Sequence, residues 1–348
     1  MRVDRRTFLK IAGAGSASLA LAACGTTAQE PAAEEEPAEE EPAADAEPVA
    51  VRTAALKGPT AMGLVRFMSE VDAGNLADND YTFEIYAAPD EITPLIAKEG
   101  VDVAAVPANL AATLYNKTEG GVRVIAINTL GVLYICELGD TVRSVEDLRG
   151  KTIYASGKGS TPEYGLQYVL EKNGLTVGED VQIEWKSEHA ECVQALATAE
   201  GEAVAMLPQP FVTTAQAQND KIRVALDLTE EWDRVQTGDE TSSMITGVAV
   251  VRSAFADENP AAVDAFLEHY AESVDFVNEN VADAAQLVGS YDIVPAQVAE
   301  KALPECNIVC VTGEDMKERL SGYLAVLADQ NAEAVGGAVP GDDFYYGA

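Results

Sequence analysis

An internal repeat with a period of about one hundred residues constrains this 348-residue chain more than any other feature. The segment VRVIAINT at residues 122–129 returns as IRVALDLT at residues 222–229. Residues 101–114 and 202–215 match as a short apolar strand, a proline and a helical pattern. Residues 53–68 and 152–170 match as a strand that leads into a helix. Three matches in the same order indicate two halves built on one plan.

Each half alternates strands with helices, which predicts an α/β lobe with a parallel sheet and helices on both faces. LGVLYICEL at residues 130–138 leads from the first half into the second, and MITGVAVVR at residues 244–252 leads back. Two crossings predict a two-strand hinge with a ligand cleft between the lobes. We expect lobe 1 at residues 49–134 and 245–348, and lobe 2 at residues 135–244. Residues 259–280 have apolar positions at helical spacing and are expected to pack on lobe 1.

The N-terminus has the plan of an export signal. A basic head precedes twelve weakly apolar residues, 11–22, too few to cross a bilayer as a helix. Adjacent Arg5 and Arg6 resemble the twin-arginine signal, but Asp4 departs from it, so the general secretion route stays open. LAAC at residues 21–24 resembles a bacterial lipobox, which predicts a signal peptide at residues 1–24 and acylation of Cys24. Such a chain is exported and lipid-anchored to the outer face of the cell membrane.

Residues 25–48 are predicted to be a disordered acidic linker, because residues 29–48 hold nine acidic residues and no aromatic or basic one. The whole chain has a net charge of −35, which makes nucleic acid a poor partner. The four other cysteines, 136, 192, 306 and 310, are expected to be free or buried thiols. A strand between Cys306 and Cys310 would hold their Cα atoms about 13 Å apart, beyond the reach of a disulfide.

Four loops at predicted strand–helix junctions carry the candidate ligand contacts, because ligands of open α/β sheets bind where strands end and helix N-termini present unpaired N–H groups. Ordinary turns and caps need the same residue types, and Ser160 with Glu163 predicts a capping box. The repeat would bring corresponding loops of both lobes face to face across one cleft. The candidates are Lys57, Gly58, Pro59 and Thr60; Asn109; Gly157, Lys158, Gly159, Ser160 and Thr161; and Gln209, Pro210 and Phe211.

Signals for catalysis are sparse. The sequence has no G-x-S-x-G or H-E-x-x-H motif, no cysteine cluster at zinc spacing and only two histidines. We therefore expect no catalytic residue, metal site or cofactor. Glu188 and His189 are predicted to lie in a loop on the cleft side, either as ligand contacts or as plain polar residues of a helix start, with an acid–base pair as the alternative.

The export signal, linker, paired lobes and cleft together resemble bacterial ABC-transporter substrate-binding lipoproteins, in particular the group that binds sulfonates, nitrate, taurine and thiamine precursors. The segments that carry the resemblance are ALKGPTAMGL, DVAAVPANLAATLYNKT, NTLGVLYI, LRGKTIYASGKGSTPEYGL and LPQPFVTT. The resemblance implies the type II periplasmic-binding-protein fold, a small-molecule ligand, and delivery to a permease with its ATPase. It also implies that the candidate loops line the cleft. We expect a monomer.

The expected mechanism is hinge closure around a ligand that contacts both lobes. An anionic group suits helix N-termini with Lys57 and Lys158 nearby, although the acidic body argues mildly against one. Tyr164, Phe211 and Trp232 are candidates for stacking on a flat heteroaromatic ring, with ordinary packing as the alternative. Two other functions stay open: an enzyme on the same fold, of the pyrimidine or menaquinone-precursor type, and a surface sensing or adhesion module.

Overall fold

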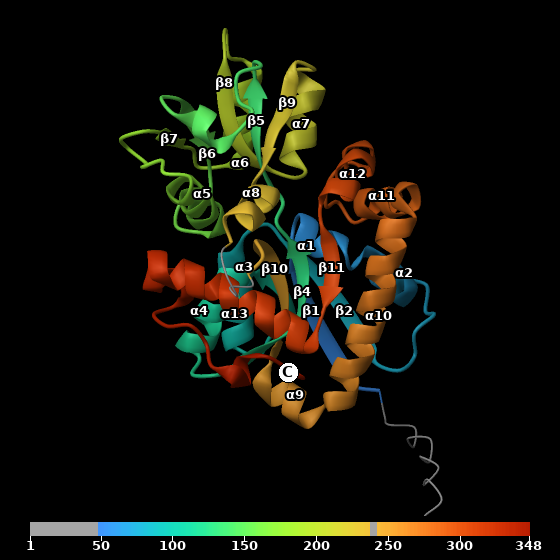
Figure 1. Cartoon of the computed structure of the whole chain (residues 1–348). Helices are drawn as coiled ribbons and strands as arrows, with labels where there is room; N and C mark the ends of the chain where they lie inside the picture. Colours follow the sequence, from blue (N-terminus) through green and yellow to red (C-terminus); the bar gives the residue numbers. More distant parts are fainter. Residues whose placement is uncertain (1–47, 237–241) are drawn as a thin grey trace, which may run out of the picture. The chain divides into compact units, whose positions relative to one another are not determined.

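Two β-sheets organise residues 48–236 and 242–348, which the computed structural model describes (Figure 1). Both sheets fall within one compact unit of the chain. The predicted signal peptide, Cys24 and the acidic linker up to residue 47 lie outside the described residues. The first sheet has the strand order β11-β4-β10-β3-β1-β2, and the second has the order β7-β6-β8-β5-β9.

The strands of the first sheet are β1 (Ala50–Leu56), β2 (Asp80–Tyr86), β3 (Val103–Pro107), β4 (Val122–Leu130), β10 (Ile245–Arg252) and β11 (Ile308–Val311). Those of the second sheet are β5 (Leu133–Leu138), β6 (Thr152–Ala155), β7 (Gln182–Trp185), β8 (Ala203–Pro208) and β9 (Ile222–Asp227). The chain crosses between the sheets at residues 131–132 and returns between α8 (Leu228–Val235) and β10. We call the first sheet with its helices lobe 1, and the second lobe 2.

Both sheets are mixed, so the prediction of a parallel sheet in each lobe is wrong for the strands that follow. β10 is antiparallel to β3 and β4, β5 is antiparallel to β8 and β9, and β11 is antiparallel to β4. The crossings explain the direction of β5 and β10. Leu133, at the start of β5, pairs with Pro208 at the end of β8, and β10 likewise starts beside the end of β3. β5 and β10 enter their sheets at the cleft and therefore run away from the cleft, whereas their neighbours β8 and β3 run toward the cleft.

The sequence repeat is a structural repeat. The order β2-β1-β3-β10-β4 in lobe 1 corresponds to β7-β6-β8-β5-β9 in lobe 2, with the same strand directions. The repeated segments VRVIAINT and IRVALDLT begin the equivalent strands β4 and β9. The predicted α/β fold of two related lobes is therefore confirmed.

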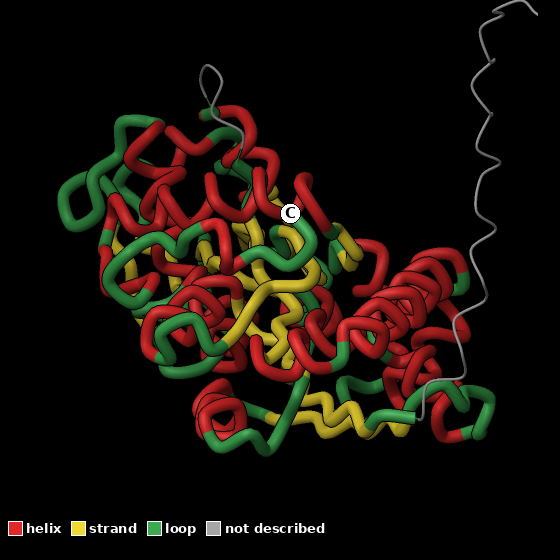
Figure 2. Tube along the Cα trace, turned by 90° about the horizontal axis from the view of Figure 1, so that it is seen from below, coloured by secondary structure: helices red, strands yellow, loops and turns green. Residues whose placement is uncertain are grey.

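Helices cover both faces of each sheet, and Figure 2 shows the strands lying between them. In lobe 1, neighbouring residues of one strand, such as Ala54 and Ala55, join hydrophobic clusters on opposite faces. One face carries α3 (Pro89–Ala97), α4 (Ala108–Lys117) and α13 (Gly313–Gln330). The other carries α1 (Pro59–Met62), α2 (Val65–Asp72), α9 (Ser253–Glu258), α10 (Pro260–Glu279), α11 (Val281–Ser290) and α12 (Ala296–Ala302).

In lobe 2, α5 (Thr161–Lys172) and α8 pack on one face of the sheet, and α6 (His189–Ala197) and α7 (Phe211–Gln218) pack on the other. The predicted helix at residues 259–280 is α10, which buries Val263, Phe266 and Tyr270 against lobe 1. Cys136, Cys192, Cys306 and Cys310 are free thiols, as predicted. Among residues 48–236 and 242–348, none of the helices combines the length and apolar character that a membrane span requires.

Candidate functional site

A cavity of about 280 Å³ lies between the lobes, where strands of both sheets end. We call it the cleft cavity. The residues that line it come from the loops after β1, β6 and β8, the end of β3, the first residue of α6, and the chain next to both crossings. Its lining consists of Leu56, Lys57, Gly58, Pro59, Thr60, Pro107, Val132, Leu133, Gly157, Ser160, Thr161, Pro162, His189, Pro208, Gln209, Pro210, Phe211 and Thr246.

The cleft cavity brings together most of the residues predicted as ligand contacts. These are Lys57, Gly58, Pro59, Thr60, Gly157, Ser160, Thr161, His189, Gln209, Pro210 and Phe211. Four others do not line it. Lys158, Gly159 and Glu188 are exposed to solvent, and Asn109 bonds to Thr161 instead. The role of all these residues in ligand binding stays a prediction.

Two predictions about local structure are wrong. His189 begins helix α6 and Glu188 precedes it as the N-cap residue, so the pair does not lie in a loop. The capping box is also missing, because the Ser160 hydroxyl donates to the carbonyl of Gly157 at 2.7 Å. Glu163 accepts instead from the N–H of Gly159, at 2.6 Å. The loop before α5 is thus closed by its own hydrogen bonds.

Gly157 is needed at the start of this loop for two reasons. Its φ of +82° lies in the left-handed region, where side chains are strained. A Cβ there would also lie 2.8 Å from Cγ of Pro162, which lines the cleft cavity. The glycine therefore lets the chain turn tightly beside the cavity wall.

Hydrogen bonds within the described part of the protein leave the side-chain donors of Gln209 and Thr246 available to a ligand, whereas the donor of Thr60 is used. The Thr60 hydroxyl donates to the Leu56 carbonyl at 2.8 Å. The Gln209 carbonyl oxygen accepts from the Thr213 hydroxyl at 3.0 Å, and no hydrogen bond in the described part of the chain uses the Gln209 NH₂ group. The Thr246 hydroxyl is buried and has no partner among the described residues. An unpaired buried hydroxyl is costly, which makes Thr246 a strong candidate ligand contact.

His189 meets Ser156 and Phe211 at the cavity wall. Its Nδ1 lies 2.5 Å from the Ser156 hydroxyl, and its ring centroid lies 5.0 Å from that of Phe211. Burial lowers the pKa of His189 to about 4, so the imidazole is neutral at physiological pH. A neutral histidine offers one N–H donor and one acceptor rather than a charge.

The remainder of the wall is mainly apolar. Five prolines, together with Leu56, Val132, Leu133 and Phe211, supply half of the lining residues. No aspartate or glutamate lines the cavity in the described ranges, although the chain as a whole is strongly acidic. Lys57 is the one formally charged residue of the lining, and its Nζ lies 3.5 Å from Oδ2 of Asp292. The cavity thus suits a ligand with an apolar body and an electron-rich end.

The hypothesis of an aromatic sandwich is wrong for two of its three residues. Trp232 is fully buried and packs against Tyr168 and Tyr323, with ring centroids 4.2 and 5.4 Å away. The Tyr164 hydroxyl accepts from the Asn331 side chain at 3.2 Å. Only Phe211 of the three lines the cleft cavity. The other two aromatic side chains serve packing within lobe 2 and against lobe 1.

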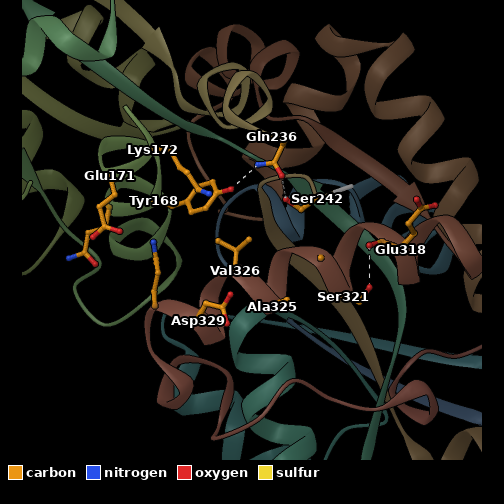
Figure 3. A pocket seen from close by; sticks show the side chains of 13 residues that line it. Tyr168, Glu171, Lys172, Gln236, Ser242, Glu318, Ser321, Ala325, Val326 and Asp329 are labelled. Atoms are coloured by element: carbon orange, nitrogen blue, oxygen red, sulfur yellow. Dashed lines mark hydrogen bonds between the residues drawn. The ribbon is translucent and has the colours of Figure 1, made fainter. Parts of the chain in front are cut away.

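A larger cavity of about 760 Å³ lies on the seam between α5 and α13, and we call it the seam cavity (Figure 3). Figure 3 shows Gln236 between Tyr168 and Ser242. Gln236 Nε2 donates to the Tyr168 hydroxyl at 3.3 Å, and the Ser242 hydroxyl donates to Gln236 Oε1 at 2.8 Å. These bonds connect the segment between α8 and β10, where the chain returns to lobe 1, with helix α5.

Charge and position both favour the cleft cavity over the seam cavity as the ligand site. Glu171, Glu318 and Asp329 line the seam cavity with one basic residue, Lys172, so an anion would be repelled there. None of the strand–helix loops of the sheets opens into it. In open α/β folds, ligands bind outside the carboxyl ends of strands, which is where the cleft cavity lies.

Sequence reasoning missed seven residues of the lining: Leu56, Pro107, Val132, Leu133, Pro162, Pro208 and Thr246. A usable signal existed for the prolines, because Pro107 and Pro208 both end an apolar strand at equivalent points of the repeat. Val132 and Thr246 belong to the two crossing segments, which were identified only as a hinge.

The sequence matches the family described as "ABC transporter, phosphonate, periplasmic substrate-binding protein" over residues 73–302. The chain belongs to this family. The predicted resemblance to ABC substrate-binding proteins is confirmed, and this binding protein therefore serves solute uptake through an ABC transporter. No match to it is found among curated proteins.

Solved structures share the fold of this binding protein. An ABC transporter protein from Parabacteroides distasonis aligns with a TM-score of 0.69 and 20% identity over 85% of this chain and 98% of that one. The aliphatic sulphonate binding protein SsuA from Escherichia coli aligns with a TM-score of 0.64 and 16% identity, over 82% of this chain and 88% of that one. The nitrate-binding protein NrtA from Synechocystis PCC 6803 aligns with a TM-score of 0.52 and 17% identity, over 72% of this chain and 69% of that one. At such identities the likeness establishes the periplasmic-binding-protein fold and leaves the ligand open.

Proposed function

We propose that this binding protein captures a small organic anion in the cleft cavity by closure of its two lobes and delivers it to an ABC permease with its ATPase. The observation that carries the proposal is a cavity of about 280 Å³ lined from both lobes, which among the described residues has one lysine, several donors and no carboxylate. A ligand held from both sides makes its full contacts only when the lobes are together, so its binding shifts the population toward the closed form.

Contacts between the lobes support this mechanism. The Thr161 hydroxyl of lobe 2 donates to Asn109 Oδ1 of lobe 1 at 3.2 Å. On the α12 side, the Tyr134 hydroxyl of lobe 2 donates to the carbonyl of Glu305 at 3.0 Å. Apolar packing joins the lobes as well, because the ring centroid of Trp232 on α8 lies 5.4 Å from that of Tyr323 on α13. The structure therefore has the two lobes in contact, as a form closed around a ligand requires.

A thermal-shift panel tests the ligand class. We expect alkanesulfonates, alkylphosphonates or small carboxylates to raise the melting temperature, since a ligand that binds only the native state stabilises it by mass action. Nitrate tests whether the apolar body of the ligand matters, and a thiamine-type pyrimidine tests the heteroaromatic alternative. A response to the pyrimidine alone, or to none of the anions, would contradict the proposal.

We infer that the cleft cavity binds without catalysis. Glu188 is exposed and does not line the cavity, whereas His189 does and pairs with Ser156. The acid–base pair that an enzyme would need is therefore not assembled. Within the described ranges, no group of three or more His, Cys, Asp or Glu side chains is arranged to hold a metal ion.

We also propose that the chain acts outside the cytoplasm as a monomer, anchored through lipid on Cys24. The family description as periplasmic supports export, and LAAC at residues 21–24 supports the anchor. Expression of the full chain with Cys24→Ala tests the anchor. We expect the variant to move from the membrane fraction to the soluble fraction, and retention in the membrane would contradict the anchor. A Cys310→Ala variant serves as the matched control, because that cysteine belongs to the folded body.

A further inference from the structure

The number of negative charges that the cleft cavity accepts follows from its lining, given the anion-binding function proposed above. Lys57 is the one charged residue of the lining within residues 48–236 and 242–348, and Oδ2 of Asp292 lies 3.5 Å from its ammonium group. Both partners are well exposed to solvent, with 42% and 103% of the side chain accessible, so the aspartate weakens the lysine charge without cancelling it. The cavity offers about one positive charge to a ligand.

His189 is the second group that decides the charge, and its position keeps it neutral. It is the first residue of α6, where the positive end of the helix dipole disfavours a charged imidazole. Its ring packs beside Phe211 of α7 and bonds to Ser156 after β6. In the described part of the chain it forms no ion pair.

The titratable groups around His189 do not supply a counter-charge. On its own element, Glu191 is exposed and accepts from the N–H of Ser187. Glu188 is exposed at the helix start, and Lys186, before α6, pairs with Glu184. Lys57, across the cavity, is positive and further disfavours a second cation.

Ser156 contacts the His189 ring at Nδ1 and can donate to it or accept from it. It is 2% exposed, and its hydroxyl lies 2.5 Å from Nδ1 of His189. A hydroxyl that donates to Nδ1 leaves the single imidazole proton on Nε2. His189 then contributes a donor to an anion without contributing a charge.

We propose that Ser156 holds His189 as a neutral donor into the cleft cavity, so that the cavity selects an anion of one negative charge over the dianion of an alkylphosphonate. The second charge of a dianion would be buried against prolines and aliphatic side chains with no counter-charge, which is strongly unfavourable. Sulfonates and carboxylates meet this requirement, and a phosphonate meets it only when singly protonated.

Calorimetric titration with a matched pair tests the selectivity. The purified full chain is titrated with propane-1-sulfonate and with propylphosphonate, at pH 9, where the phosphonate is mainly a dianion, and at pH 6, where it is a monoanion. We expect the sulfonate to bind at least fivefold more tightly at pH 9, and the difference in affinity to narrow at pH 6. Equal or tighter phosphonate binding at pH 9 would overturn this inference alone. No binding of sulfonate, phosphonate or carboxylate would overturn the anion-binding function as well.

Substitutions of His189 test the cause. His189→Gln keeps a neutral donor and should keep the preference for the sulfonate at pH 9. His189→Lys adds a charge and should shift the preference toward the phosphonate by at least fivefold at pH 9. His269→Gln is the matched control, because the other histidine of the chain lies on α10 and bonds to Asp78 at 3.1 Å. An unchanged preference in His189→Lys would contradict the proposal.

The positioning role of Ser156 has a spectroscopic readout. In nitrogen NMR of the full chain, His189 should show a protonated Nε2 and an unprotonated Nδ1, with His269 as an internal reference. Ser156→Ala should give a mixture of tautomers and weaken the binding of propane-1-sulfonate several-fold. An unchanged tautomer pattern in Ser156→Ala would show that the hydroxyl does not position the ring.

Discussion

Asp102 gives a quantitative test of what holds lobe 1 together. Its carboxylate is 2% exposed and accepts from the backbone N–H of Arg52 at 3.0 Å. It also accepts from Nε and Nη2 of Arg52 and from Nη2 of Arg252, each at 2.8 Å. These bonds join the start of β1, the start of β3 and the end of β10, at the strand ends that lie away from the cleft.

The cost of Asp102→Ala follows from the burial of its partners. Arg252 has 14% of its side chain exposed and would keep only the exposed Glu99, 3.9 Å away, as a counter-ion, so the loss of its buried partner costs about 3–5 kcal/mol. Arg52 is 44% exposed, so its lost pair adds only about 0–1 kcal/mol. We expect the free energy of unfolding to fall by about 4 kcal/mol. At roughly 2 °C per kcal/mol for a chain of this size, the melting temperature should fall by about 8 °C.

The same carboxylate predicts a pH dependence. Burial raises the pKa of Asp102, but the hydrogen bonds from Arg52 and Arg252 outweigh burial and lower the pKa overall. A carboxyl with a depressed folded pKa stabilises the fold above its unfolded pKa of about 3.9, and the contribution is lost as the pH falls through the folded value. The stability gap between the parent chain and Asp102→Asn should be constant between about pH 7 and pH 5 and narrow below about pH 4.

Urea unfolding followed by circular dichroism measures both effects, and Asp257→Ala is the control. Asp257 pairs with Arg123 at the surface, where the two side chains are 62% and 28% exposed, so its removal should cost less than about 1 kcal/mol. A difference below about 1 kcal/mol between Asp102→Ala and Asp257→Ala would refute the reasoning from burial. Ligand affinity well below the melting temperature should be unchanged in both variants, because both pairs lie outside the lining of the cleft cavity.

Two further predictions concern the cleft itself. Gly247→Ala would place a Cβ 2.5 Å from both Asn128 Oδ1 and Thr60 Cγ2, so we expect a lower melting temperature together with weaker binding of any anion found in the thermal-shift panel, measured by calorimetry. Retained affinity would mean that Thr60 is not displaced. Asn109→Ala removes the acceptor of the Thr161 hydroxyl between the lobes, so we expect affinity to fall several-fold with little change in melting temperature. A large loss of stability instead would assign Asn109 to folding rather than to closure.

The fold was predictable because the repeat encodes it twice. Two related runs of alternating strands and helices define two sheets of the same strand order, and the structure has them. Strand direction was not predictable from that alternation alone. The directions of β5 and β10 depend on where the chain enters each sheet, and that is a property of the crossing rather than of the strand sequence.

Local chemistry at the loops was harder to predict than their position. Ser160 and Glu163 have the spacing of a capping box, yet each bonds to the glycine-rich loop before α5. The glycines let that loop fold back on the helix start, which brings closer partners than the cap would offer. Trp232 could be a ligand contact or a packing residue by sequence, since an aromatic residue near a cleft and one in the core look alike there, and the structure has it in the core.

The two crossings explain why the cavity is lined by residues that no loop motif in the sequence predicts. Because β5 and β10 start at the cleft, the residues at their starts lie among the ends of the neighbouring strands, and Val132 and Thr246 therefore line the cavity. The same segments join the lobes. Any rotation of one lobe against the other must act through them, so the hinge and part of the binding surface are one piece of chain. A ligand that meets the unpaired Thr246 hydroxyl would thus bind directly on the segment that closure moves.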